Sequence, residues 1–477
     1  MAKSPNVLIV IADDQSYPHA SAYGSKMVST PGFDLVAKKG ALFTNAYVTS
    51  PGCSPSRASL LSGLYPWQVE EAGSHASSFS TKYVCFPDLL QHAGYHIGYT
   101  GKGWGPGNWE ISGRKFNPAG PEYNSLTLTA PYSGISKTDY TANFKKFLSE
   151  RKEGQPFYFW VGTQEPHRPF ESNSWRKKGY KLSQAKVPGF LPNNDTIKSD
   201  LLDYAMEIAW SDSHLMNCIN ELKRIGEFEN TIIIVTADNG MSFPYAKANC
   251  TDAGIHVPLA ICWGNKISPN QVIQTLVSTI DIAPTVFAAT AVKPAGPLSG
   301  QNLLPLVSGN PKAYKEDAIY AGRERHSFSR YNNLGYPMRS IRWKNYLLIH
   351  NFHPERWPAG DPKEITKDGT LSDAYYDIDD APSKQFLINL RNDPTINPFF
   401  ELAVGKRPEF ELYDLTKDRD CMHNIVNDPS SAVVLKTLKQ KLNDKLVATN
   451  DTRIGNNPEV WETYPRLEGK MRNFQAN

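Results

Sequence analysis

The chain has 477 residues, 40% of them hydrophobic and 21% charged, and a formal net charge of +3. This length exceeds that of a usual single hydrophobic core, so we expect one large domain and a smaller one. The small net charge, without a basic block, argues against nucleic acid as a partner. No apolar run approaches the roughly 20 residues of a membrane-spanning helix, so no membrane span is expected.

Through the first two-thirds of the chain, short apolar runs alternate with helical patterns. The runs are rich in Val, Ile, Phe and Tyr and show little alternation, as expected for strands buried on both faces. Helical periodicity is clearest over residues 200–225. This order predicts an α/β fold with a large, mostly parallel sheet between layers of helices. The predicted strands cover residues 6–12, 95–100, 157–162, 231–236 and 257–263.

The pattern changes after Arg323. Two antiparallel strands are expected at 338–343 and 346–350, joined by a turn, and a further strand and a closing helix follow at 410–414 and 432–446. We therefore predict a catalytic domain over residues 1–330. A smaller C-terminal α+β domain, residues 331–477, is expected to contribute to the rim of its pocket.

Acidic side chains follow two predicted strands. Asp13 and Asp14 come directly after the first strand, and Asp238 and Asn239 come closely after the strand at 231–236. Ligands of open parallel sheets bind at the carboxyl ends of the strands. Three carboxylates there carry a charge of about −3, which needs a cation when partly buried. Oxygen ligands of this kind favour Ca²⁺, with Mg²⁺ second.

Six cysteines are too few for a disulfide scaffold, and their spacing gives no metal-ligand pair, although a Cys250–Cys262 bridge remains open. One of them begins a distinctive motif, Cys53-Ser-Pro-Ser-Arg57, followed by Ala-Ser-Leu-Leu-Ser-Gly63. This motif resembles the modification signature of the type I sulfatases, in which the cysteine is oxidised to formylglycine. One hydroxyl of the hydrated aldehyde can attack sulfur and the other can then expel sulfate, which divides one difficult step into two.

The resemblance extends from Asn6-Val-Leu to Glu411-Leu-Tyr-Asp-Leu415. It is to the formylglycine-dependent sulfatases of the alkaline phosphatase superfamily. Within them the chain is most similar to the heparan N-sulfatase (sulfamidase) pattern, through Asp238-Asn-Gly240, Phe243-Pro244 and Tyr336-Pro-Met-Arg-Ser340. The family implies a signal peptide that has been removed, a periplasmic or secreted location, and a formylglycine-generating maturase as a partner.

The resemblance also implies roles for individual residues. Ca²⁺ would be held by Asp13, Asp14, Asp238 and Asn239. Cys53 would become the nucleophile, Arg57 would hold its hydrated aldehyde, and His167 would assist the leaving group. Lys102 and Lys247 would bind sulfate, whose oxygens need neutralising as sulfur is attacked.

One position departs from the family. Sulfatases of this kind carry a Lys-x-His pair, whereas this chain has Lys102-Gly103-Trp104. Either a water or a nearby histidine (His19, His75 or His256) takes over, or sulfate elimination proceeds differently. The departure weakens transfer of the sulfamidase substrate to this chain.

A stretch rich in Arg, His and Trp runs from Arg323 to Trp357. Arginine suits recognition of carboxylates and sulfates, and the stretch is similar to those of bacterial sulfatases acting on polysaccharides such as ulvan. The alternative is a salt-bridged surface between domains. The substrate-binding residues predicted for this pocket are His75, Trp104, Arg323, Arg325 and His326.

The leading hypothesis is an exo-acting carbohydrate sulfatase that removes O-sulfate from an algal or plant-type oligosaccharide such as ulvan. N-sulfoglucosamine is the alternative substrate. A second enzyme class is the phosphate or phosphonate monoester hydrolases, because that branch can share both the fold and the formylglycine signature. A non-catalytic protein that binds sulfated glycans would require that Cys53 is never oxidised or that the missing histidine is fatal to activity.

Overall fold

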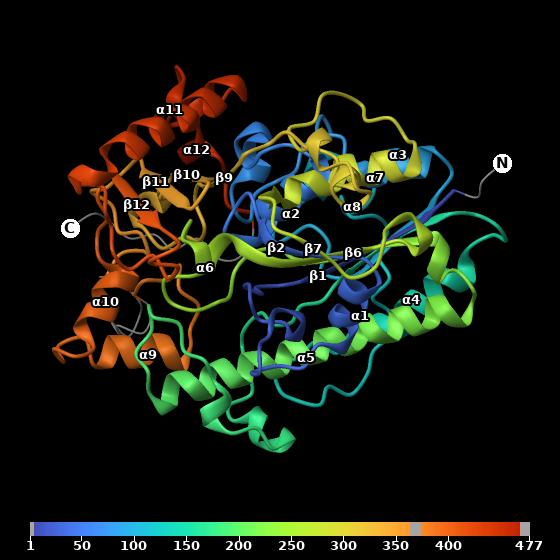
Figure 1. The fold of residues 1–477 in the computed structure, drawn as a ribbon, viewed down its shortest axis with the longest axis horizontal. Coiled ribbons are helices and arrows are strands. Elements are labelled where there is room, and N and C mark those ends of the chain that lie inside the picture. Colours follow the sequence, from blue (N-terminus) through green and yellow to red (C-terminus); the bar gives the residue numbers. More distant parts are fainter. Residues whose placement is uncertain (1–3, 363–373, 468–477) are drawn as a thin grey trace.

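The computed structural model describes residues 4–362 and 374–467. Its main feature is a sheet that runs through the middle of the molecule (Figure 1). Among the described residues its strands have the order β3-β4-β1-β5-β6-β2-β7, and β8 also pairs with β2. These strands are β1 Asn6–Ala12, β2 Ala41–Tyr47, β3 His96–Gly101, β4 Phe157–Gly162, β5 Thr231–Ala237, β6 His256–Cys262, β7 Gln271–Ile273 and β8 Val277–Ser278.

The sheet is mostly parallel, as predicted. In register, Val10 of β1 lies opposite Val161 of β4 on one side and Val235 of β5 on the other, and β3 continues the parallel set. β6 runs antiparallel to both β5 and β2. The chain from 238 to 255 returns at the same edge of the sheet, so the next strand runs in the opposite direction. The carboxyl ends of β1, β3, β4 and β5 therefore share one edge.

Helices cover both faces of the sheet (Figure 1). Alternate side chains of β1 point to opposite faces, which places Ile9 in one hydrophobic cluster and Leu8 in another. One face packs against α1 Pro31–Lys39, α4 Tyr140–Glu150 and α5 Asp195–Arg224, and the other against α2 Cys53–Ser62, α3 Phe86–His92, α7 Ile282–Thr290 and α8 Leu304–Val307. α6 Asp252–Ile255 is a single short turn before β6.

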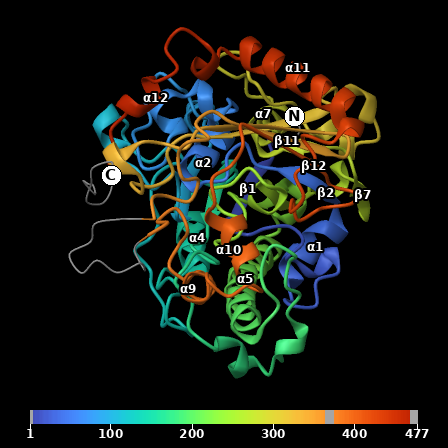
Figure 2. The same ribbon diagram turned by 90° about the vertical axis from the view of Figure 1, so that its left-hand side faces the viewer.

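A second, antiparallel sheet lies beside the first. Its order is β12-β11-β10-β9, formed by β9 Ala318–Arg323, β10 Met338–Trp343, β11 Tyr346–Asn351 and β12 Phe410–Asp414. Figure 2 shows α11 Ala432–Ala448 above this sheet and α9 Pro382–Asn389 and α10 Asn397–Val404 below it, while α12 Val460–Thr463 lies near the end of the described chain. Because β9 precedes residue 330, the second sheet takes one strand from the predicted larger domain. The boundary at 330 stays a prediction.

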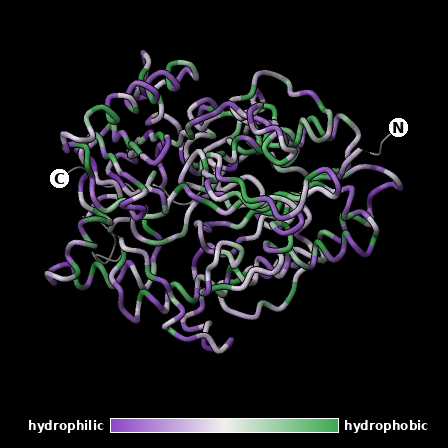
Figure 3. Tube along the Cα trace, viewed as in Figure 1, coloured by the Kyte–Doolittle hydropathy of each residue, from purple (hydrophilic) through white to green (hydrophobic). Residues whose placement is uncertain are grey.

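Hydrophobic residues concentrate in the strands at the centre of the molecule (Figure 3). Among the described helices, none is both long and apolar enough to span a bilayer. All six cysteines are free, and Cys250 and Cys262 belong to different hydrophobic clusters. The bridge left open by the sequence is therefore not formed.

Candidate active site

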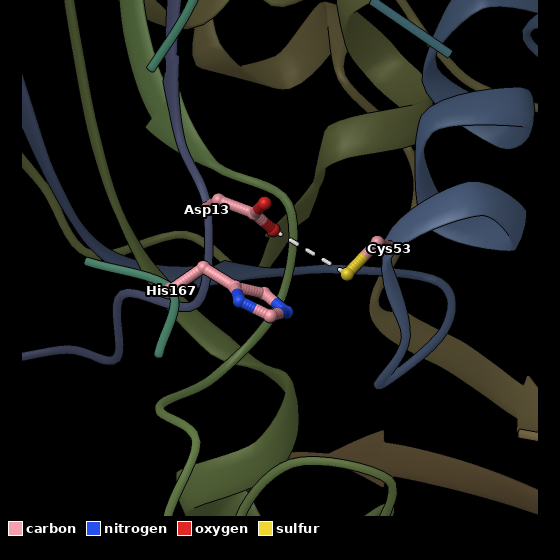
Figure 4. A group of neighbouring side chains, drawn as sticks. All are labelled: Asp13, Cys53 and His167. Atoms are coloured by element: carbon pink, nitrogen blue, oxygen red, sulfur yellow. Dashed lines mark hydrogen bonds between the residues drawn. The ribbon is translucent and has the colours of Figure 1, made fainter. Parts of the chain in front are cut away.

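Cys53 is the first residue of α2, a helix whose ten residues are all buried. Gly52 caps it in an extended conformation, and Pro55 lies in the first turn, where a missing N–H costs nothing. The Cys53 Sγ lies 3.3 Å from Oδ1 of Asp13, and Figure 4 shows the two side chains pointing toward one another. Burial, and then the charge of Asp13, raise the pKa of the Cys53 thiol well above its usual value. An unmodified Cys53 is thus a protonated, weakly nucleophilic thiol.

Three carboxylates meet at the shared sheet edge. Asp13, Asp14 and Asp238 each offer an oxygen within 4.8 Å of the others, and all three side chains are buried. Asp14 has a φ of 74°, a conformation that aspartate tolerates better than most residues. Its backbone N–H donates to Oδ1 of Asp238 at 3.1 Å. The Oδ1 of Asn239, also buried, has no hydrogen-bond partner, so it is available as a metal ligand.

Each carboxylate also has a basic partner. Lys102 Nζ donates to Asp13 at 2.5 Å, Lys247 Nζ to Asp14 at 2.7 Å, and Arg57 Nε to Asp238 at 2.7 Å. Burial, and then the charge of Asp13, raise the pKa of Asp238 to about 6. Burial opposes ionisation of Asp13 too, but Lys102, His167 and Arg57 hold its pKa well below the usual range.

Three acids and three bases leave this cluster near neutrality. A divalent cation bound to it would make the site positive, which suits an anionic substrate.

The position of Lys102 is set by the close approach of the ends of β3 and β4. A Cβ on Gly162 would lie 1.9 Å from the carbonyl oxygen of Lys102. The same carbonyl accepts a hydrogen bond from Arg57 at 2.6 Å and one from the Trp160 indole at 2.9 Å. Only glycine at 162 lets the chain after β3 lie so close to β4, with the Lys102 side chain directed at Asp13.

A cavity of about 700 Å³ opens above this cluster, a size usual for small-ligand sites. Seven of the fourteen predicted site residues line it: Asp13, Cys53, His75, Lys102, His167, Lys247 and His326. The remaining residues of the predicted metal and nucleophile set, Asp14, Arg57, Asp238 and Asn239, are buried next to it through the contacts above.

His167 follows β4 and its ring lies beside Cys53 and Asp13 (Figure 4). Its Nδ1 lies 2.7 Å from the carbonyl oxygen of Arg168, to which it donates, so proton exchange with a ligand falls to Nε2. Nε2 lies 3.8 Å from Oδ2 of Asp14. Arg168 is itself held by a bidentate ion pair with Asp200, at 2.8 and 2.7 Å, which anchors the loop that carries His167.

Three predicted substrate-binding residues are not in the cavity lining. Trp104 is buried against Phe79, and its Nε1 donates to the Ser54 carbonyl at 3.0 Å, so it supports the start of α2. Arg323 is buried in an ion cluster with Asp377, and Arg325 donates to the Tyr464 carbonyl at 2.9 Å. The expectation that these two arginines line the rim was therefore wrong. Arg323 is neutralised by Asp377 and Arg325 is buried against a backbone carbonyl, and His326 faces the cavity instead.

Asp379 is a cavity residue that the sequence did not reveal. Its Oδ2 lies 3.3 Å from Lys247 Nζ, and its carboxylate groups with Asp14 and His167 within 4.8 Å. Burial opposes its ionisation, but Lys247 and His167 lower the pKa of Asp379 below its usual value. It follows no strand of the main sheet, so only the folded chain brings it to the site. Other unpredicted lining residues include Arg168, Lys384 and Arg466.

The sulfatase family model matches residues 5–292, more than half of the chain. The chain belongs to the sulfatase family. It is accordingly a sulfuric ester hydrolase of the alkaline phosphatase superfamily. A second model, described as the C-terminal region of N-sulphoglucosamine sulphohydrolase, matches residues 244–387 of this sulfatase.

Two curated relatives extend over most of the sulfatase. The N-sulphoglucosamine sulphohydrolase of Homo sapiens is 27% identical over 485 aligned positions, covering 92% of this chain and 89% of that protein. An ulvan-active sulfatase of Formosa agariphila is 24% identical, covering 94% and 76%.

Two solved structures share the fold. One, determined with its substrate D-glucosamine-2-N,6-O-disulfate, has a TM-score of 0.68 at 19% identity and covers 96% of this chain and 100% of that chain. The other, a phosphonate monoester hydrolase of Agrobacterium radiobacter, has a TM-score of 0.66 at 18% identity and covers 94% and 97%.

Proposed function

We propose that this sulfatase releases sulfate from a sulfated saccharide, using Cys53 after a maturase has oxidised it to formylglycine. The observation that carries the proposal is the position of Cys53. It lines the cavity at the start of α2, yet its burial and Asp13 keep the thiol protonated. A thiol held in this way is a poor nucleophile. The hydrated aldehyde supplies hydroxyl groups in its place, one as nucleophile and one to expel sulfate.

We propose that Ca²⁺ is held by Asp13, Asp14, Asp238 and Asn239. The set supplies only oxygen ligands, and the unpartnered Oδ1 of Asn239 supports it. When bound, the cation supplies charge that stabilises the reacting sulfate.

The neighbouring residues have matching roles. Lys102 and Lys247 would hold the sulfate oxygens, and His167 would pass a proton from Nε2 to the leaving atom. The Nη2 of Arg57 is buried without a hydrogen-bond partner and lies 3.8 Å from Oδ1 of Asp13. That free N–H can hold an oxygen at position 53, while the rest of the guanidinium is fixed by Asp238 and backbone carbonyls.

For the substrate, we propose an N-sulfated glucosamine at the end of an oligosaccharide as the first candidate. The match to the N-sulphoglucosamine sulphohydrolase C-terminal model and the coverage of the human relative support it. The O-sulfate of an ulvan-type oligosaccharide is the second candidate, supported by the two ulvan-active relatives. Burial of Arg323 and Arg325 removes the reason, taken from the sequence, for ranking it first. Exo action and a periplasmic or secreted location stay predictions.

The test uses protein co-expressed with a formylglycine-generating maturase. Conversion lowers the mass of the Cys53 peptide, whereas ordinary thiol oxidation raises it. Sulfate release is then measured on N-sulfoglucosamine oligosaccharides, O-sulfated ulvan oligosaccharides, and phosphate and phosphonate monoesters. Sulfate release from the first supports the leading candidate, and release only from the second reverses the order. Faster hydrolysis of the phosphorus esters than of every sulfate would overturn the proposal.

A further inference from the structure

Two histidines face each other in the wall of the active-site cavity. The ring centroids of His75 and His326 lie 4.6 Å apart at an interplanar angle of 36°. Both line the cavity together with Cys53. His75 follows the 3₁₀ turn Glu70–Gly73, and His326 lies three residues beyond the end of β9. The pair thus joins segments that are 251 positions apart in the chain.

Both histidines lie close to the start of α2, where Cys53 is the first residue. The backbone N–H of Ala76, next to His75, donates to Oγ of Ser54 at 3.2 Å. The Nδ1 of His326 lies 3.1 Å from the point that a Cβ on Gly52 would occupy. The His326 ring therefore lies against the residue before Cys53, and the segment that carries His75 is bonded to the residue after it. Glycine at 52 leaves the space in which the His326 ring approaches the start of α2.

Hydrogen bonding distinguishes the two rings. Nη1 of Arg466 lies 3.5 Å from Nδ1 of His75 and also donates to the carbonyl of His326 at 3.1 Å. Arg466 therefore orients His75 and the backbone of His326 together. Among the described residues, the ring of His326 makes no hydrogen bond, so its nitrogens are open to a ligand in the cavity.

Both imidazoles are neutral at pH 7. Burial lowers the pKa of His326 to about 3, although Asp377 opposes this, and Lys247 and Arg323 lower it further. Burial, and then His326 itself, lower the pKa of His75 well below the usual value, with Arg466, Lys247 and Lys102 acting in the same direction. A sulfate group in the cavity adds negative charge, which raises the proton affinity of a neighbouring imidazole.

We propose that His326 is the base that takes the proton from position 53 when sulfate is expelled, with His75 as the residue that positions it. This inference rests on the proposed function, because it concerns the second half of that reaction. His326 would thereby supply what the tryptophan at 104, buried under α2, cannot.

This expulsion of sulfate needs no reagent other than water. After transfer, position 53 carries one free hydroxyl and one oxygen bonded to the SO₃ group. The hydroxyl proton goes to a nitrogen of His326, the C=O bond forms, and the bond from carbon to the sulfate oxygen breaks. Sulfate leaves, water adds to the aldehyde, and His326 releases its proton to solvent in the cavity.

The other cavity bases are less suited to this step. Lys102 and Lys247 are ion-paired, and although burial opposes it, Asp13 and Asp14 raise their respective pKa values above the usual value. Neither has a free electron pair at neutral pH. His167 is the real competitor, because a ring that has protonated the leaving group could also accept the next proton.

The experiment is a rapid-quench measurement on maturase-converted protein with a small aryl sulfate. In His326→Asn we expect a burst of about one phenol per converted site, followed by turnover slowed about 10²-fold, the usual contribution of a general base. The intact mass of the quenched protein should show one SO₃ group retained on the peptide that contains position 53. His75→Asn should retain less of this adduct, because it disturbs only the orientation of the ring. His326→Gln is the second variant if His326→Asn does not fold.

The matched control is His214→Asn. His214 is a buried histidine whose pKa burial lowers to about 4, and it does not line the cavity. It should show neither adduct nor slow phase. Slow turnover of His326→Asn without a burst or an adduct would overturn the inference. Turnover at the wild-type rate would also overturn it and would leave His167 as the base. Absence of sulfate release from the fully converted wild-type protein would instead refute the proposed function.

Discussion

Replacing Asp377 with asparagine tests whether the arginines after β9 hold the fold rather than the substrate. The Asp377 carboxylate pairs with both Arg323 and Arg330, the latter at 2.6 Å, and accepts the Ser327 backbone N–H at 3.0 Å. All three charged side chains are buried. Asparagine leaves two buried guanidinium groups without their counter-charge. Breaking a buried pair in this way costs about 3–5 kcal/mol, so we expect a loss of that size in the free energy of unfolding.

The assay is denaturant unfolding at pH 7. Burial opposes ionisation, but Arg330 and Arg323 hold the pKa of Asp377 well below its usual value. Its contribution is therefore complete at pH 7 and disappears as the pH falls below about 4. Glu70→Gln is the control, because it breaks an exposed pair with Lys82 and should cost less than about 1 kcal/mol. A loss below about 1 kcal/mol for Asp377→Asn would refute this reasoning.

Four further results are expected. Arg323→Met should lower kcat/KM by the same factor on a charged oligosaccharide and a small aryl sulfate, since Arg323 does not line the cavity; a selective loss on the oligosaccharide would return it to the substrate site. Asp238→Ala should lose bound metal by elemental analysis while staying folded by circular dichroism. Cys53→Ala should abolish turnover with a nearly unchanged melting temperature. Burial, and then Glu165, raise the pKa of Glu207 to about 9, so stability falls as the pH rises from about 4.5 toward 9, and the melting-temperature advantage of Glu207→Gln should grow from pH 5 to pH 8.

The sequence predicted the strands that carry the site because each is a continuous apolar run followed by a polar residue. β1, β4 and β5 were placed to within one residue, and Asp13 and Asp238 at their carboxyl ends do meet. β2 was missed because Thr44 and Asn45 interrupt it, and the structure shows a register shift there. β7 and β8 were missed because strands of three and two residues leave no periodicity to detect.

The sequence could not predict which charged side chains pair when they lie far apart in the chain. Arg323 and Arg325 were expected at the rim because arginine suits anions, but whether an arginine faces a ligand or a buried acid depends on residues far along the chain. Asp377 decides the case of Arg323 by neutralising it inside the protein. Asp379 shows the same difficulty at the site itself, because it pairs with Lys247 in the cavity although it lies 132 positions away in the chain. The antiparallel direction of β6 could not be predicted either, because a continuous apolar run is equally compatible with a parallel and an antiparallel strand.

The dependence of activity on conversion of Cys53 tests the proposed function most directly. Preparations made with graded amounts of maturase are compared, with the aldehyde fraction at position 53 taken from peptide mass and the sulfate-release rate measured on each. We predict a rate proportional to the aldehyde fraction, falling to zero where Cys53 is entirely thiol. Sulfate release at the full rate by protein with an unmodified Cys53 would contradict it.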